Sequence, residues 1–388
     1  MEFYRKTRYN SGITINMKLN KLSAIPVLFC LSLFIDFFSP LYSQSHPVKG
    51  VWVTNVLSDA LDSRENIREA VKLCSETGIN NIYVVTWNNA RTIYPSKIMK
   101  ERFGIPIMER FSGRDPLREI IEEAHKKQIK VHAWFEFGFS CSYRESDGGI
   151  IIQRYPHWAA IDREGKLVTK NGFQWMNAFD PEVQDFITSL ITEVVSGYNV
   201  DGIQGDDRLP AAPSESGYDK YTVNLYKSLH NGALPPAESK NPEWVQWRAD
   251  LLTGYLGNLC RQVKNIKPGI IISMAPSIHP WAREQYLQDW PAWFEKGYVE
   301  YVIPQVYRAN FKDYKSTLAA QIKLLRETDK LKFFPGVLLK ADGKIFPTEG
   351  LLDSMIMENR RNGIKGECFF YFEGLKNFSD FFKNYSCK

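Results

Sequence analysis

Short apolar segments alternate with longer amphipathic segments along most of this chain, and this alternation constrains the fold more than any other feature. The apolar segments are rich in Val, Ile, Tyr and Trp, which is typical of buried strands. We therefore expect strands at residues 50–55, 81–87, 130–136, 200–206, 270–275, 301–307, 332–339 and 367–373.

The amphipathic segments carry the signals of helices. At Asp115-Pro116 and Asp180-Pro181 an Asp can cap a helix and a Pro can occupy its first position. One expected helix starts at Asp115-Pro116. The others lie near residues 65–77, 180–198, 242–266, 284–296, 314–328 and 348–362, with a short one at the C-terminus.

Eight strand–helix units in strict order predict a parallel sheet covered by helices. Eight such units indicate a closed (β/α)8 TIM barrel of the α/β class, a single domain over residues 46–388. The alternative is an open doubly wound sheet, which normally carries a Gly-rich phosphate loop after its first strand. Residues 55–59, Asn-Val-Leu-Ser-Asp, contain no glycine, which favours the barrel.

Two connections are longer than ordinary loops. Residues 138–178 follow the third expected strand, and residues 208–241 follow the fourth. Both come after strands, on the face of a barrel where active sites lie. We expect these long loops to contribute to function.

The N-terminal residues 1–45 have the pattern of an extension followed by an export signal. Met17 to Lys21 supply positive charge, residues 22–35 form an uncharged run of 14 residues, and Ser43-Gln44-Ser45 offers small residues for cleavage. The run is shorter than the ~20 residues of a membrane span. We expect a periplasmic or extracellular protein without a stable membrane span, and an uncleaved anchor is the alternative.

Other classes of function fit poorly. The net charge of +5 is spread along the chain with no basic block, so a nucleic-acid partner is not expected. Neither a CxxC nor an HExxH motif occurs, and the histidines show no ligand spacing, so we expect no metal site and no cofactor. After signal cleavage five cysteines remain, and few or no disulfides are expected. The oligomeric state is left open.

Carboxylates stand at the predicted carboxyl ends of strands, where barrel enzymes place catalytic groups. The fourth strand ends in Asp206 and Asp207, and the third ends in Glu136. Glycoside hydrolysis needs a proton donor and a second carboxylate as nucleophile or base, which makes these three the catalytic candidates. The alternatives are a solvated loop with a local ion pair for the two Asp, and a salt bridge to an Arg for Glu136.

Polar and aromatic side chains at other strand ends are candidates for sugar contacts, through hydrogen bonds and ring stacking. Several have a structural alternative, as a core histidine, a packed aromatic ring or a glutamine that satisfies the backbone. The candidate substrate-binding residues are Trp52, Trp87, His132, Trp134, Gln204, Arg208, Gln305, Tyr307, Arg308 and Glu373.

The same segments resemble glycosyl-hydrolase-like family 10, a group of exported bacterial barrel proteins. The matching pieces, in chain order, are Gly50-Val51-Trp52, His132-Ala133-Trp134, Asp180-Pro181, residues 198–203 running into Asp206-Asp207, and Pro304-Gln305-Val306-Tyr307. The resemblance implies a barrel glycosidase that acts on cell-envelope glycan, such as peptidoglycan strands stripped of their peptides. It also implies Asp206 and Asp207 as the active-site acids.

This chain departs from the family pattern at a few positions. Gln204 stands where the family often has His, and Arg208-Leu209-Pro210 replaces an aromatic-rich continuation. Glu136 and Gly138 stand where a small polar residue and Pro are more usual. These differences bear on the substrate more than on the fold.

The sequence therefore predicts a glycoside hydrolase that cleaves a polysaccharide by carboxylate acid–base chemistry. Asp206 is expected as nucleophile or base, and Asp207 or Glu136 as proton donor. The alternative is a barrel that binds glycan without cleaving it, and a third possibility is a surface scaffold without glycan affinity. Whether the anomeric centre inverts is left open, because that depends on the separation of the carboxyl groups.

Overall fold

The computed structural model describes residues 47–386. The expected export signal at residues 1–45 lies outside these residues, as do residues 387–388. The described residues belong to one compact unit that begins at Pro47. No helix within them is long and apolar enough to cross a membrane.

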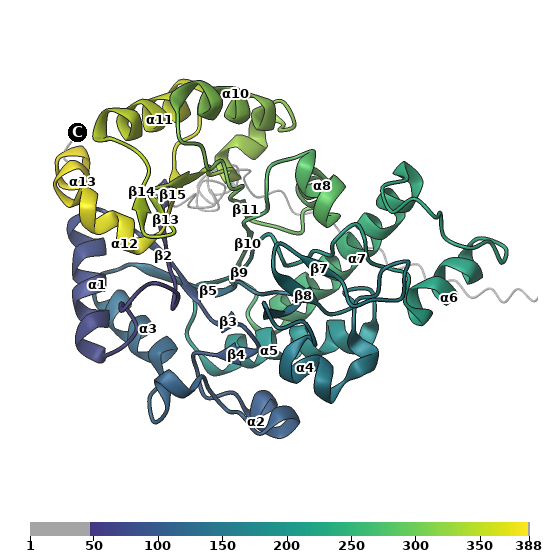
Figure 1. Ribbon diagram of the computed structural model, residues 1–388. Coiled ribbons are helices and arrows are strands. Elements are labelled where there is room, and N and C mark those ends of the chain that lie inside the picture. The colour runs from purple at the N-terminus through teal and green to yellow at the C-terminus, as the bar shows by residue number, and fades with distance from the viewer. Residues whose placement is uncertain (1–46, 387–388) are drawn as a thin grey trace, which may run out of the picture. The chain divides into compact units, whose positions relative to one another are not determined.

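Eight parallel strands form the centre of this unit (Figure 1). In spatial order they are β11 (Tyr301–Val302), β10 (Ile271–Met274), β9 (Gly202–Gly205), β5 (Lys130–Phe135), β2 (Asn81–Val85), β1 (Lys49–Val53), β15 (Glu367–Phe370) and β12 (Gly336–Leu338). A parallel bridge between Val302 and Phe333 joins the two ends of this order, and the Phe334 amide donates to the Val302 carbonyl at 3.0 Å. The predicted (β/α)8 barrel is confirmed.

Helices follow the strands and cover the outside of the sheet (Figure 1). They are α1 (Arg64–Glu76), α3 (Pro116–Lys126), α5 (Pro181–Gly197), α7 (Pro242–Ile266), α8 (Trp281–Tyr286), α9 (Trp290–Glu295), α10 (Phe311–Ile322), α11 (Glu349–Arg361), α12 (Phe372–Leu375) and α13 (Ser379–Ser386), with short 3-10 turns η3 (Glu327–Lys332) and η4 (Lys376–Phe378).

The two Asp-Pro pairs begin helices as the sequence predicts. The Asp115 carboxylate accepts from the Arg118 amide at 3.1 Å, and the Asp180 carboxylate accepts from the Glu182 amide at 2.8 Å. Each cap satisfies an amide that the first turn of a helix leaves without a partner.

Several expected elements differ from the observed ones, among them the seventh strand, which was expected over residues 332–339 and covers Gly336–Leu338. The sixth strand, expected over residues 301–307, ends at Val302, and Pro304 has no N–H with which to continue the ladder. The eighth strand ends at Phe370, so Glu373 lies in α12. The helix expected near residues 284–296 is two short helices, because Leu287 takes a left-handed conformation that ends α8.

Both long connections contain secondary structure of their own. The connection after β5 holds an antiparallel sheet of β6 (Ser140–Tyr143), β8 (Phe173–Trp175) and β7 (Thr169–Lys170), with α4 (Gly149–Arg154) and η2 (Pro156–Trp158). The connection after β9 carries α6 (Lys220–Leu229).

Shorter elements complete this face of the barrel. They are the hairpin of β3 (Trp87–Asn88) and β4 (Arg91–Thr92), then α2 (Lys97–Phe103) and η1 (Glu109–Phe111), and the hairpin of β13 (Lys340–Ala341) and β14 (Lys344–Ile345).

The barrel interior is packed with large side chains from alternate strand positions. The rings of Tyr83 and His132 stack with centroids 4.6 Å apart, and His132 Nε2 lies 2.9 Å from Asn81 Oδ1. Position 202 must be glycine here, because a Cβ atom on Gly202 would lie 2.1 Å from His132 Nδ1. The inside of the ring is therefore a solid core below the carboxyl ends of the strands.

Candidate active site

Asp206 lies at the carboxyl end of β9 and is almost fully buried, with 2% of its surface exposed. Its Oδ1 accepts from the backbone amide of Arg208 at 3.0 Å. Its Oδ2 accepts from Trp134 Nε1 and from the Arg208 guanidinium, both at 3.2 Å. Both oxygens are thus engaged, and the carboxylate is held in one position at the top of the barrel core.

Arg208 brings the three candidate acids together. Its guanidinium lies 3.2 Å from Asp206 Oδ2, 3.0 Å from Asp207 Oδ1 and 3.7 Å from Glu136 Oε1. The guanidinium carbon also lies 4.5 Å from the centre of the Phe173 ring, a cation–π contact. One buried cation therefore faces three carboxylates that come from neighbouring strands β5 and β9.

The environment favours a proton on two of these acids. Burial raises the pKa of Glu136 above its ordinary value, against the opposing effects of Arg208 and of a hydrogen bond from Asn88. Burial also raises the pKa of Asp206 well above its ordinary value; Arg208 opposes this rise, and Asp207 and Glu136 reinforce it. A carboxyl that retains its proton close to a second carboxyl group is an arrangement that acid–base catalysis uses.

Glu136 opens onto a cavity of about 430 Å³ above the barrel, which we call the central cavity. Loops after β1, β2, β5, β12 and β15 all contribute to it, so it lies on the carboxyl-end face. Its lining residues are Thr54, Val56, Leu57, Asn88, Asn89, Glu136, Phe137, Tyr143, Asn171, Phe173, Ala341, Asp342, Phe370 and Tyr371.

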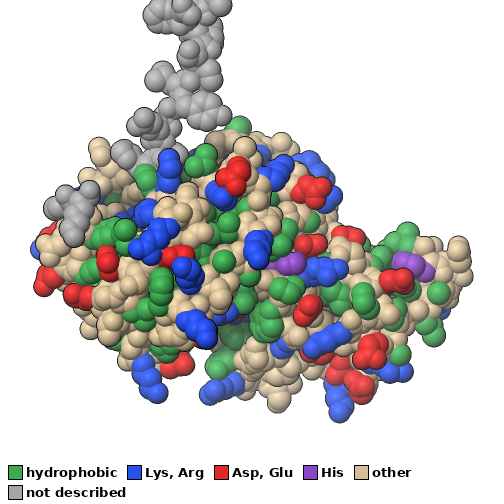
Figure 2. Space-filling model, turned by 90° about the horizontal axis from the view of Figure 1, so that it is seen from above, with side chains coloured by type: hydrophobic (Ala, Val, Ile, Leu, Met, Phe, Trp, Pro, Cys, Tyr) green, Lys and Arg blue, Asp and Glu red, His purple; other side chains and the backbone are tan. Residues whose placement is uncertain are grey.

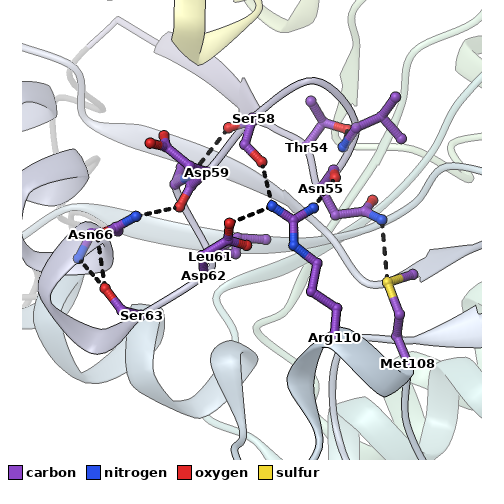
Figure 3. A network of polar contacts seen from close by, with 12 residues as sticks. Thr54, Asn55, Ser58, Asp59, Leu61, Asp62, Ser63, Asn66, Met108 and Arg110 are labelled. Carbon is purple, nitrogen blue, oxygen red and sulfur yellow. Dashed lines mark hydrogen bonds and ion pairs between the residues drawn. The ribbon is translucent and has the colours of Figure 1, made fainter.

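The loop after β1 forms one wall of this cavity and is held by Arg110 (Figure 3). The Arg110 guanidinium donates to the carbonyl oxygens of Asn55 at 2.9 Å and Ser58 at 3.0 Å, and it pairs with the Asp62 carboxylate. Three anchors on one planar group fix the backbone of the loop. Val56 and Leu57, which line the cavity, lie between the two anchored residues Asn55 and Ser58.

Sequence reasoning did not identify most of the residues that line the cavity. Tyr143, Asn171 and Phe173 come from the long connection after β5, and Asp342 comes from the β13–β14 hairpin. The length of the first connection indicated a functional loop. Which of its residues face the cavity follows only from the pairing of β6 with β8.

Four candidate sugar contacts lie in the protein core, and we leave them out of the candidate site. Trp52 Nε1 donates to Gln204 Oε1 at 2.7 Å, and both residues are buried inside the ring. Trp87 Nε1 donates to the Gly138 carbonyl at 3.1 Å, and the side chain of Trp87 is fully buried. Burial lowers the pKa of His132 to about 3, so its ring is neutral.

The remaining candidate sugar contacts make hydrogen bonds or ring contacts with other residues of the protein. Trp134 holds Asp206, as described above, and the Tyr307 ring packs on Phe370 with centroids 5.1 Å apart. Gln305 donates to the Ala275 carbonyl at 3.2 Å, and Arg308 Nε donates to Thr317 Oγ1 at 3.1 Å.

Glu373 lies outside the acid cluster. Its carboxylate accepts from Ser58 Oγ at 2.8 Å and pairs with Lys376 at 2.8 Å. These contacts join α12 to the loop after β1. Glu373 thus supports a wall of the central cavity and is not part of its lining.

Residues 47–386 contain no group of three or more His, Cys, Asp or Glu side chains arranged to hold a metal ion. The acid cluster is instead occupied by the Arg208 guanidinium, which supplies the positive charge among the carboxylates.

Comparison with known families identifies the group to which these features belong. Residues 47–339 match the family model described as glycosyl hydrolase-like 10, and this segment is most of the chain. The chain belongs to the glycosyl hydrolase-like 10 family. The family match covers β1 to β12 with both long connections, so it includes Asp206, Asp207 and Glu136.

Two curated relatives carry the name glycosyl hydrolase. DigH of Escherichia coli K12 is 27% identical over 290 residues, which are 67% of this chain and 62% of DigH. YngK of Bacillus subtilis is 22% identical over 326 residues, which are 72% of this chain and 59% of YngK. The chain thus spans about three fifths of the length of these relatives.

Solved structures of glycoside hydrolases share the fold. The glycoside hydrolase domain of PgaB (BpsB) from Bordetella bronchiseptica superposes with a TM-score of 0.65 at 11% identity, covering 87% of this chain and 98% of that domain. An alpha-L-fucosidase from Paenibacillus thiaminolyticus gives a TM-score of 0.63 at 17% identity, covering 88% and 49%. At these identities the likeness supports the barrel fold alone.

Gln204, Arg208 and Glu136, three of the residues expected to depart from the family pattern, make defined contacts in the structure. Gln204 is a buried hydrogen-bond partner of Trp52, and Arg208 is the cation of the acid cluster. Glu136 is the acid that reaches the central cavity.

Proposed function

We propose that this protein is a glycoside hydrolase that cleaves the glycan strands of bacterial peptidoglycan after their peptides have been removed. The observation that carries the proposal is Glu136, a carboxyl with a raised pKa that lines a cavity on the carboxyl-end face of the barrel. The family match and the names of DigH and YngK support the reaction class. The choice of peptidoglycan rests on the family resemblance.

The environments of the three acids suggest different roles. Glu136 holds the proton that is delivered to the glycosidic oxygen, because burial favours its neutral form. We assign the role of nucleophile or base to Asp207, whose side chain is 23% exposed and is the most accessible of the three. Glu136 is the one of the three that lines the central cavity, and Asp207 lies across the Arg208 guanidinium from it. Asp206 has both oxygens engaged and positions Arg208, which pairs with Asp207 at 3.0 Å.

The lining of the central cavity suits a sugar ring. Tyr143, Phe173, Phe370 and Tyr371 offer aromatic surfaces against which the flat face of a pyranose can pack. Asn171 offers an amide to sugar hydroxyl groups. Side chains that combine ring surfaces with a few polar groups are typical of small-molecule sites.

We also propose that the protein is exported, on the basis of the pattern in residues 1–45.

Positive and negative side chains are interspersed over the face of the molecule seen in Figure 2, with no broad patch of one sign. This face therefore lacks the broad patch of positive charge that binding of nucleic acid would favour.

One observation favours a second candidate function, glycan binding without cleavage. Arg208 is near all three acids, and Asp206 has no free oxygen atom. If Arg208 held every acid in its ionised form, no proton donor would remain. The barrel would then bind a sugar in the central cavity and leave the bond intact.

Incubation of the protein with peptide-free peptidoglycan strands, beside a panel of other envelope polysaccharides, tests the proposal. We expect mass spectrometry to detect shorter strands, and Asp207→Asn to remove most of this product. The control is Asp185→Asn, which alters an exposed acid on α5 and should cleave normally. Binding without product over long incubation would instead support the second candidate.

A further inference from the structure

A second hollow adjoins the central cavity, and we call it the side pocket. Its volume is about 490 Å³, and its polar lining includes Asn55, Asn88, Asn89, Arg91, Glu145 and Gln153. These residues come from the loop after β1, the β3–β4 hairpin and the connection that holds β6 and α4. The pocket therefore lies on the same carboxyl-end face as the candidate acids.

The two hollows share a border at the β3–β4 hairpin. Asn88 and Asn89 line both of them. Asn88 Nδ2 donates to Glu136 Oε2, and Asn89 Oδ1 accepts from the Tyr143 amide at 3.1 Å. The side pocket thus begins at the residue whose amide donates to the Glu136 carboxyl.

Asn55 lines the side pocket and carries an acceptor, Oδ1, that no residue between 47 and 386 satisfies. The residue is 8% exposed. Its Nδ2 lies 3.5 Å from the sulfur of Met108 (Figure 3). Buried polar atoms normally have a partner, so an O–H or N–H of a ligand is the fitting one.

The backbone already holds Asn55 in place. Arg110 donates to the Asn55 carbonyl at 2.9 Å, and the same guanidinium is fixed by Ser58 and Asp62 (Figure 3). The backbone that carries the unsatisfied oxygen is therefore fixed. A group that is positioned before binding loses little conformational entropy when the ligand arrives.

The charges of the side pocket balance. Among the described residues that line it, Arg91 and Glu145 are the charged ones, and they carry opposite signs. Amides and the Ser142 hydroxyl supply most of the other polar groups. A neutral ligand with many hydroxyl or amide groups matches this lining better than one that carries a net charge.

We propose that the side pocket is a second sugar subsite, which binds a neutral pyranose unit of the strand whose neighbouring unit lies in the central cavity. The inference rests on the proposed function, because it takes a glycan strand as the ligand. It adds that the substrate is an extended strand bound over more than one unit. Asn55 and Arg91 are the residues that recognise the outer unit.

A length series of chitin oligosaccharides, which carry no charge, tests the subsite by calorimetry. We expect the affinity of the wild-type protein to rise about tenfold when the chain becomes long enough to reach the side pocket. Asn55→Ala and Arg91→Ala should each remove most of this rise. Asn55→Asp keeps an acceptor oxygen and should retain part of it. Asn258→Ala, an exposed position on α7, is the control that keeps the full rise.

The outcomes separate the two proposals. If peptidoglycan strands are cleaved but Asn55→Ala and Arg91→Ala keep the full dependence on chain length, the subsite is overturned and the hydrolase stands. If the length dependence is lost in these variants but no glycan is cleaved, the subsite stands and the hydrolase fails. Thermal unfolding of each variant identifies loss of fold, and Arg91→Ala decides if Asn55→Ala does not fold.

Discussion

Arg208 is attached to the backbone of Glu136 more closely than to its carboxylate. Arg208 Nε donates to the Glu136 carbonyl oxygen at 2.9 Å, whereas the guanidinium lies 3.7 Å from Glu136 Oε1. The backbone just after strand β5 therefore holds the Arg208 guanidinium in place. The guanidinium pairs most closely with Asp207 and Asp206. This geometry leaves the Glu136 carboxyl able to hold a proton in the central cavity.

Glu136→Gln should lower the rate of glycan cleavage by about 10²–10⁴-fold, which is the usual contribution of a positioned general acid. The amide cannot donate an acidic proton, yet it keeps the size of the side chain, so binding should persist. Product formation and oligosaccharide affinity, measured on the same preparation, separate the two effects. Glu101→Gln changes an exposed acid on α2 and should behave as the wild type. Unchanged cleavage by Glu136→Gln would remove Glu136 from the mechanism.

Asn88→Ala should move the alkaline limb of the pH–activity profile upward. The hydrogen bond from Asn88 Nδ2 stabilises the ionised form of Glu136 and so lowers its pKa. Without that bond the pKa of Glu136 rises further, and the proton donor survives to higher pH. The measurement is kcat/KM against pH for both proteins. A limb that moves downward would contradict the proposed role of Glu136 as acid.

Arg208→Met should destabilise the fold by about 3–5 kcal/mol at neutral pH, because it leaves buried carboxylates without their cation. In the variant the pKa values of Asp206 and Glu136 rise further above their ordinary values. The folded state then binds more protons than the unfolded state, so stability falls as pH rises from the ordinary carboxyl range through these raised values.

Urea unfolding near pH 4 and pH 7 checks this prediction. The loss of stability caused by Arg208→Met should be smaller at the lower pH, where Asp206 and Glu136 take up protons. An equal loss at both pH values would show that packing of Arg208 on Phe173, and not its charge, accounts for its effect.

Trp52→Phe should cost about 1–3 kcal/mol, because it leaves Gln204 Oε1 without its donor inside the barrel. The double variant Trp52→Phe with Gln204→Leu replaces both partners by apolar groups and should recover part of that loss. Denaturant unfolding of the single and double variants measures the coupling. If the loss caused by Trp52→Phe and the loss caused by Gln204→Leu simply add, the two side chains are not coupled through this hydrogen bond.

Much of the fold could be predicted from the order of elements. Apolar runs such as residues 81–85 and 130–135 became adjacent parallel strands, and the caps at Asp115 and Asp180 began helices as expected. These features depend on residues close together in the chain, so local patterns are sufficient to predict them. Asp206, Asp207 and Glu136 also came together, because β5 and β9 are neighbours in the ring.

The depth of each side chain in the barrel could not be predicted in the same way. Trp52, His132 and Gln204 occupy inward-facing positions on their strands, as residues near a ligand also do. All three nevertheless pack in the core below the cavity. Alternation indicates which face of a strand points inward, but not how far along the axis a residue lies. That distance depends on the stagger of neighbouring strands.

The sequence by itself thus determined the barrel, its helix starts and the presence of acids at neighbouring strand ends. Only the tertiary structure decided that Arg208 joins those acids, that Tyr143 and Phe173 line the cavity, and that Asn55 faces a second hollow. The physical reason is that local patterns set the period of each element. Contacts between residues far apart in the chain determine which side chains of different elements meet.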